Sequence, residues 1–238
     1  VEQKKYAKGK NLLQEGNDFL FDLKYQKQLF DYINNQKLND REKLNAYFTS
    51  FFNAFKNYKK NNKKKKYVTA FTPRINFFDY SINKFFSIYP DGFFLSIIRH
   101  PKNWLASALF HSKIYSDINH ALSLWLQSTE RSIQIKNKYI NSIIINFDNL
   151  ISESNSTMKK IANKINIEYN DSLVLPSFNG EPTYSNSSFQ TKKETIDKET
   201  LNRSSYINDS TFKKVNINLY NKCLDTYNLS LTVSLNLN

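Results

Sequence analysis

The sequence predicts an α/β domain of three layers, in which a mostly parallel sheet carries helices on both faces. Segments with helical spacing of apolar residues alternate with short apolar runs along most of the chain. The last of these runs, residues 142–147, is almost continuously apolar, as is typical of parallel strands that are covered on both sides. With 238 residues, the chain is most simply one domain that can bury a substantial core.

Three runs rich in β-branched and aromatic residues predict strands, at residues 67–71, 93–98 and 142–147. The first is stopped by Thr72-Pro73-Arg74, and the turn sequence Tyr89-Pro90-Asp91-Gly92 stands before the second. With helices between the strands, we expect right-handed crossovers and a parallel order.

The helices are predicted from apolar spacing and from their first residues. Asn39, followed by Glu42 three positions later, matches a capping box, and Pro101 suits the first turn of a helix. Ser154 or Ser156 is the expected cap of a short late helix. The predicted helices cover residues 18–34, from 39 or 40 to about 55, 76–89, from 101 onward, 117–138, 158–165 and 210–226.

These elements divide the single predicted domain, residues 1–238, into four parts. Residues 1–66 form a helical N-terminal part, and residues 67–170 form the α/β core. Residues 171–209, which are rich in Ser, Asn and Thr, are expected to be a long loop with a binding role. Residues 210–238 form a C-terminal helix and tail.

The composition limits the classes of function. The net charge is +13, yet only five of the 34 basic residues are arginine, and the lysines are dispersed apart from residues 59–66. We therefore interpret the charge as a solvated surface and expect no nucleic-acid partner. The single cysteine, Cys223, and the lack of an apolar signal or membrane segment predict a cytoplasmic chain. No cluster of residues has metal-ligand spacing, so no metal is expected.

Arg99 is the strongest candidate for a binding residue. It ends a predicted strand and stands beside a new helix N-terminus, the position where α/β sheets bind anions. In a chain that otherwise uses lysine, the planar guanidinium suggests a phosphate or sulfate ligand. The pattern alone is also compatible with purely structural roles. Arg99 could form a salt bridge at the end of the strand, and Ser107 could be a small residue that allows the helix to pack closely on the sheet.

The segment Arg99-His100-Pro101-Lys102-Asn103-Trp104-Leu105-Ala106-Ser107 resembles the 3′-phosphate-binding segment of bacterial-type sulfotransferases that use PAPS (3′-phosphoadenosine 5′-phosphosulfate). Further stretches are similar to that family in the same order. These are Thr72-Pro73-Arg74, Tyr89-Pro90-Asp91-Gly92, Phe147-Asp148-Asn149-Leu150 and the loop of Leu175–Gly180 with Asn186–Phe189. The resemblance covers roughly residues 67 to 225 and implies a P-loop-NTPase-like sulfotransferase fold.

The resemblance also implies site residues. Arg99 and Ser107 would hold the 3′-phosphate of PAPS or of the product 3′,5′-ADP. Asn186, Ser187 and Ser188 could close over the nucleotide. From their positions alone, Arg74 at a predicted strand end and Arg203 in the late loop are secondary anion candidates. No catalytic base is assigned.

The chain departs from the family at its beginning. Nothing matches the first strand and its Arg-Ser-Gly-Thr type loop, which binds the 5′-phosphosulfate, and only four glycines are present. We expect that strand and loop to lie before Val1. Thr72 also stands where the family has a lysine.

The implied activity is transfer of a sulfuryl group from PAPS to a hydroxyl or amine acceptor, for example a glycan or a small molecule. One alternative is a nucleotide-dependent phosphotransferase-like or inactive nucleotide-binding domain, although no Walker loop is visible. Another is a basic nucleic-acid-binding module, which would need its lysines on one face.

Overall fold

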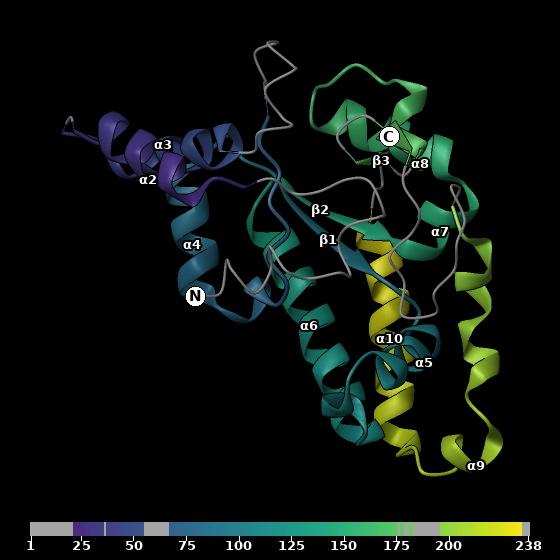
Figure 1. Ribbon diagram of the computed structural model, residues 1–238. Helices are drawn as coiled ribbons and strands as arrows, with labels where there is room; N and C mark the ends of the chain where they lie inside the picture. Colours follow the sequence, from purple (N-terminus) through teal and green to yellow (C-terminus); the bar gives the residue numbers. More distant parts are fainter. Residues whose placement is uncertain are drawn as a thin grey trace. The chain divides into compact units, whose positions relative to one another are not determined.

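The computed structural model describes residues 21–35, 37–54, 67–175, 177–178, 181–182 and 196–234 (Figure 1). The chain divides into two compact units. The N-terminal unit comprises Val1–Pro73, Lys84–Pro90 and Asn179–Glu181, and the main unit comprises Arg74–Asn83, Asp91–Phe178 and Pro182–Asn238. The predicted single domain stays a prediction.

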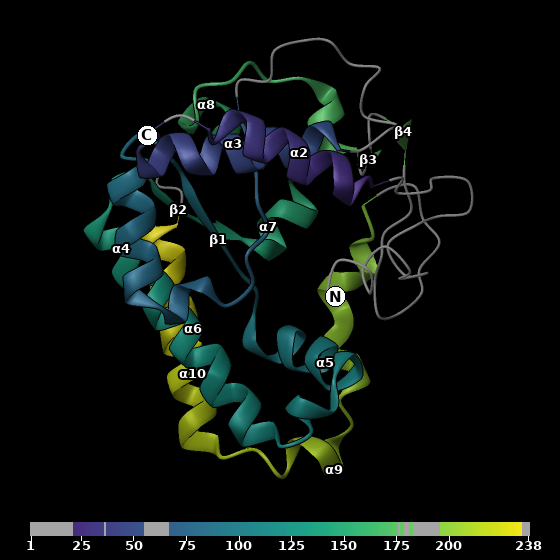
Figure 2. The same cartoon turned by 60° about the vertical axis from the view of Figure 1, so that its left-hand side comes forward.

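In the N-terminal unit, helices α2 (Leu23–Ile33) and α3 (Asp40–Asn53) lie side by side (Figure 2). The predicted capping box of α3 is confirmed: Glu42 N–H donates to Asn39 Oδ1, and Asn39 N–H donates to Glu42 Oε2, each at 2.9 Å. Aromatic side chains join the helices, with Phe30 packed edge-on against Tyr47 at 6.4 Å.

The main unit is built on two parallel strands, β1 (Phe94–Ile98) and β2 (Ser142–Asn146), paired in register from Phe94↔Ser142 to Ile98↔Asn146. Both were predicted. Every residue of β2 is buried, and its side chains alternate between two clusters. This is the pattern expected of a parallel strand with helices on both faces.

One side of β2 carries the larger cluster. Ile144 packs there with residues of α5 (Pro101–His111), α6 (Ile118–Lys138) and α10 (Ile217–Val233), and α6 and α10 run side by side (Figure 1). On the other side, Ile143 and Ile145 pack against Ile161 of α8 (Ser154–Lys164). The main unit is therefore helix-rich α/β with a small parallel sheet, and the larger three-layer sheet stays a prediction.

Shorter elements connect these parts. They are η2 (Ile75–Phe77), α4 (Asp79–Ile88), η3 (Lys113–Tyr115), α7 (Phe147–Ser152), η4 (Asp171–Val174), β3 (Ser177–Phe178), β4 (Glu181–Pro182), η5 (Lys198–Tyr206) and α9 (Asp209–Phe212).

The predicted strand at residues 67–71 is wrong. The segment is described but forms no strand, and Val68 and Phe71 are 51% and 92% exposed. Residues of this type favour a strand only where a pleated, half-buried neighbour is present, and no strand pairs with this segment in the described parts of the chain.

Three other features of the structure differ from the predictions. The predicted loop at residues 171–209 contains η4, β3, β4 and η5. Helix α7 was not predicted; Asn146 ends β2 and caps α7 at once, accepting from Asn149 N–H at 2.8 Å. Neither predicted serine caps α8, because Ser154 and Ser156 donate to backbone carbonyls instead, of Leu150 and Glu153 respectively.

Candidate anion-binding site

The backbone around Arg99 is fixed by its neighbours. Arg99 directly follows β1, and Pro101 occupies the first turn of α5 as predicted. Trp125 of α6 donates its indole N–H to the carbonyl of Arg99 at 3.1 Å. The carboxyl end of β1 is therefore held against α6. Arg99 follows it directly and stands two residues before Pro101, where α5 begins.

The Arg99 guanidinium lies in a partly buried polar setting. Its Nη1 donates to Ser107 Oγ at 2.7 Å, and its Nη2 donates to the carbonyl of Thr200. The guanidinium carbon stands 4.8 Å from the centre of the Phe147 ring. Nε of Arg99 is buried and has no hydrogen-bond partner among the described residues, which is unusual for a charged donor.

Burial and the carboxylate of Asp148 shift the pKa of Arg99 in opposite directions. Burial lowers the pKa of Arg99 to about 10, the carboxylate of Asp148 opposes the shift, and Arg203 adds to it. The guanidinium still carries its full charge at neutral pH. It is thus a cation with reduced hydration, which strengthens its interaction with an anion.

Asn103 of α5 holds η5 next to Arg99. Its amide Nδ2 donates to the carbonyl of Leu201, and its Oδ1 accepts from Ser204 N–H, both at 2.8 Å. Within the same segment, Arg203 pairs with Asp197 at 3.0 Å, and both side chains are almost fully buried. The pair fixes the segment that supplies the Thr200 carbonyl to Arg99.

A second polar cluster lies at the carboxyl end of β2. Tyr227 of α10 donates its hydroxyl to Asp148 Oδ2 at 2.8 Å and accepts from Asn146 Nδ2 at 2.9 Å. Asp148 Oδ1 is buried without a partner among the described residues. The His100 ring packs edge-on against Tyr227 at 5.2 Å, and burial lowers the pKa of His100 while Asp148 opposes that shift.

A cavity of about 420 Å³ opens in the main unit next to the end of β1. Most of its wall is aromatic or apolar, and its polar side chains come mainly from Arg74 and from α6. The lining residues are Arg74, Phe77, Phe78, Ile97, Ile98, Arg99, Trp104, Tyr115, Leu124, Trp125, Gln127, Ser128, Thr129 and Ser132.

The structure brings Arg99 and Ser107 into direct contact, as the predicted site requires. Arg74 lines the same cavity as Arg99 but donates to Tyr115, and Arg203 pairs with Asp197. The roles of all four in anion binding stay predictions. Asn186, Ser187 and Ser188 lie outside the described residues.

Sequence reasoning did not find Asn103, Thr200 or Tyr227. Asn103 stands within the quoted motif, but its partner Leu201 is 98 positions away in the sequence, so no local pattern could indicate the contact. The same holds for Tyr227 and Asp148, which are 79 positions apart.

Comparison with known proteins gives one informative result. No protein-family model and no curated protein matches this sequence. The structure, however, is similar to a solved structure described as the sulfotransferase domain from the curacin biosynthetic pathway, with a TM-score of 0.56 over 92% of this chain and 82% of that one. The fold is similar to that of a sulfotransferase domain. At 10% sequence identity the likeness extends to the fold alone, so it supports the family resemblance at that level.

The described residues add two observations. Each of their helices is too short or too polar to cross a lipid bilayer. In the same parts of the chain, no three histidine, cysteine or acidic side chains come together as a metal site would require.

Proposed function

We propose that the chain binds PAPS and transfers its sulfuryl group to a hydroxyl or amine acceptor, with Arg99 and Ser107 holding the 3′-phosphate. The observation that carries this proposal is the 2.7 Å hydrogen bond from Arg99 Nη1 to Ser107 Oγ, at the carboxyl end of a parallel strand in a sulfotransferase-like fold. The two side chains come from different elements, the end of β1 and α5, and this hydrogen bond brings them together.

The donor set suits a phosphate. Arg99 Nε is a buried N–H without an acceptor, and such a group is what a bound anion would satisfy. Ser107 uses its oxygen to accept from Arg99, which leaves its O–H to donate. The N-terminus of α5, with no acidic residue in its first turn, adds a favourable field.

In the proposed reaction, the acceptor oxygen or nitrogen attacks the sulfur. The bond from sulfur to the oxygen of the 5′-phosphate breaks, the acceptor loses its proton, and 3′,5′-ADP remains. As in phosphoryl transfer, the protein mainly positions the reactants and stabilises charge. The role of Arg99 and Ser107 in this scheme is to fix the nucleotide.

The test is calorimetric binding of 3′,5′-ADP to the wild type and to Arg99→Ala. One charged hydrogen bond contributes about 1.5–3 kcal/mol, so the variant should bind roughly 10- to 150-fold more weakly. Binding of 5′-AMP, which lacks the 3′-phosphate, should change little. Lys222→Ala is the control, because Lys222 is in the same unit but is exposed and pairs with Glu130.

Equal affinity of the wild type and Arg99→Ala for 3′,5′-ADP would remove the assignment. Turnover is measured separately, as 3′,5′-ADP released from PAPS in the presence of acceptors. Tight binding of 3′,5′-ADP without turnover would favour the alternative of a nucleotide-binding domain that is not a transferase.

A further inference from the structure

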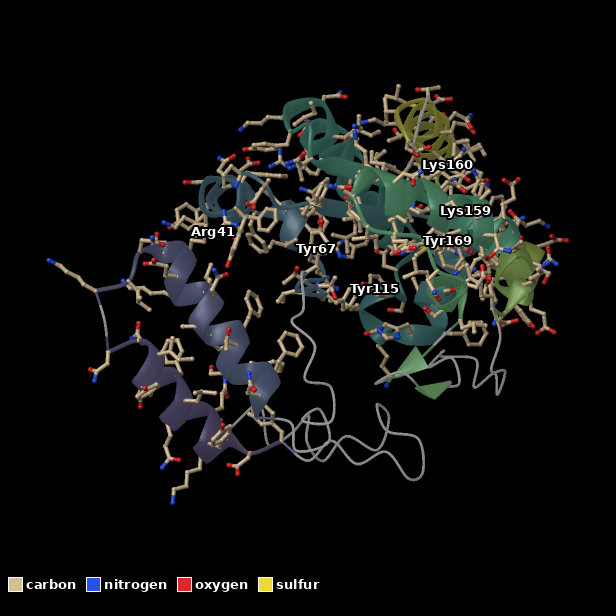
Figure 3. All side chains as sticks on the ribbon, turned by 90° about the horizontal axis from the view of Figure 1, so that it is seen from above. Arg41, Tyr67, Tyr115, Lys159, Lys160 and Tyr169 are labelled. Atoms are coloured by element: carbon tan, nitrogen blue, oxygen red, sulfur yellow. The ribbon has the colours of Figure 1, made fainter. Side chains whose placement is uncertain are left out.

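The cavity next to β1 combines flat apolar walls with two arginines, Arg74 and Arg99. Trp104 of α5 and Tyr115 of η3 pack edge-on at 5.5 Å, and Phe77 and Phe78 line the cavity from η2 and the residue after it (Tyr115 is labelled in Figure 3). Surfaces of this kind favour a planar, apolar ligand. The volume of about 420 Å³ falls within the range of small-molecule sites.

Arg74 occupies its place in the wall at a conformational cost. Its backbone has φ 65° and ψ 9°, the left-handed region that favours glycine, directly after Pro73 in a turn. Its Nη2 donates to the hydroxyl of Tyr115 at 2.9 Å, so the guanidinium is aimed at η3. Strained residues of this kind concentrate at ligand-binding positions.

The wall that carries Arg74 is firmly attached to α6. Asn76, which is buried, donates from Nδ2 to the carbonyl of Ser128 at 3.0 Å and to the hydroxyls of Ser128 and Ser132. Asp79 pairs with Arg131, and Asn83 accepts from Lys138 and Tyr139. The cavity is therefore preformed, which lowers the entropic cost of binding a ligand.

These contacts also determine which polar groups a ligand would meet. Ser128 and Ser132 are engaged with Asn76, and Thr129 donates to the carbonyl of Trp125. Arg74 retains further N–H groups, and Tyr115, which accepts from Arg74, retains its O–H. Two donors thus converge beside aromatic rings, an arrangement that fits a carboxylate.

We propose that this cavity is a binding site for an aromatic carboxylic acid, with the ring between the aromatic walls and the carboxylate on Arg74 and Tyr115. Arg99 also lines this cavity, but its Nη1 and Nη2 donate to Ser107 and Thr200, so the proposed carboxylate contacts are those of Arg74 and Tyr115. The proposal concerns binding, and it holds whether or not the chain transfers a sulfuryl group.

The test compares 3-phenylpropanoate with its uncharged amide, 3-phenylpropanamide. The chain has two tryptophans, Trp104 and Trp125, and both line the cavity, so intrinsic fluorescence reports on occupancy directly. The acid should bind the wild type at least about tenfold more tightly than the amide. Arg74→Gln should abolish this preference through loss of acid affinity, with amide affinity nearly unchanged.

Two further variants test whether the loss of acid preference in Arg74→Gln comes only from a lower net charge or from a destabilised fold. Lys113→Gln removes the same charge from an exposed residue near Tyr115 that does not line the cavity, and it should leave the preference intact. Arg74→Gly should raise the midpoint of chemical denaturation, because the left-handed backbone then costs less, and yet lose the preference for the acid.

Three results would overturn the proposal. The first is equal binding, or no binding, of acid and amide by the wild type. The second is an undiminished preference in Arg74→Gln. The third is displacement of 3-phenylpropanoate by 3′,5′-ADP with the affinity of the nucleotide itself, which would assign the cavity to the nucleotide site.

Discussion

The buried pair of Asp197 and Arg203 gives a sharp quantitative prediction. The two side chains are 3.0 Å apart and 4% and 2% exposed. Asp197→Asn removes the charge but keeps an oxygen that can cap η5, where Oδ1 accepts from Glu199 N–H at 3.1 Å. The substitution therefore isolates the ion pair from the cap.

The magnitude follows from burial. Removing one member of a buried pair takes away the charge that compensates the other and costs about 3–5 kcal/mol of unfolding free energy. Asp197→Asn and Arg203→Met should each lose an amount of this order. The double variant buries no unpaired charge, so we expect it to be within about 2 kcal/mol of the wild type.

The assay is denaturation in guanidinium chloride followed by tryptophan fluorescence. Trp104 and Trp125 both belong to the main unit, so the signal reports the unfolding of the part that contains the pair. Additive losses in the double variant would show that the two charges do not depend on each other. That result would contradict the buried ion pair between Asp197 and Arg203.

Three other predictions test particular contacts. Burial raises the pKa of Cys223 from 9.0 to about 11, so the unfolded chain loses this proton at a lower pH than the folded chain. The free energy of unfolding, measured by urea denaturation, should therefore fall as the pH rises from 9 to 11. The fall should be smaller in Cys223→Ala. Burial lowers the pKa of His100 from its ordinary 6.5, so on acidification the unfolded chain gains this proton before the folded chain does. The free energy of unfolding should therefore fall as the pH drops below 6.5. In His100→Gln the same assay should show a smaller dependence on pH in this range. Asn39→Ala should cost the N-terminal unit about 0.5–2 kcal/mol, seen as faster amide exchange in α3, whereas Asn39→Ser should cost less.

The elements predicted best are those with local causes. The capping box of Asn39 and Glu42 and the proline at the start of α5 depend on residues a few positions apart, and the structure has both. The apolar run of β2 was found because all of its residues are buried, whereas β1 was found from its residue types although Leu95 and Ile97 are exposed. Residues 67–71 are also rich in β-branched and aromatic residues, but a strand needs a second strand to pair with, and residue types alone do not show whether one is present.

The candidate site was predictable only in part for the same reason. Arg99 and Ser107 are eight positions apart, on a strand end and the following helix, so the motif contains both. Asn103, Thr200 and Tyr227 enter through contacts between distant segments. The cavity was not predicted at all, because its wall combines η2, η3, α5 and α6.

The five arginines of this lysine-rich chain support the two proposed sites together. Each arginine has a directed contact in the structure, which a planar guanidinium with several N–H donors can make. Arg41 lies over the Tyr89 ring, Arg74 donates to Tyr115, Arg99 donates to Ser107 and Thr200, Arg131 pairs with Asp79, and Arg203 pairs with Asp197. The partners of Arg131 and Arg203 are carboxylates, which neutralise the charge. The hydrogen bonds of Arg74 and Arg99 go to the neutral oxygens of Tyr115, Ser107 and Thr200, which orient a guanidinium. The carboxylate of Asp148 also acts electrostatically on Arg99, but its hydrogen bond is with Tyr227. A cation that is held in place and kept charged is what an anionic ligand requires, and this combination separates the two proposed binding arginines from the two that have carboxylate partners.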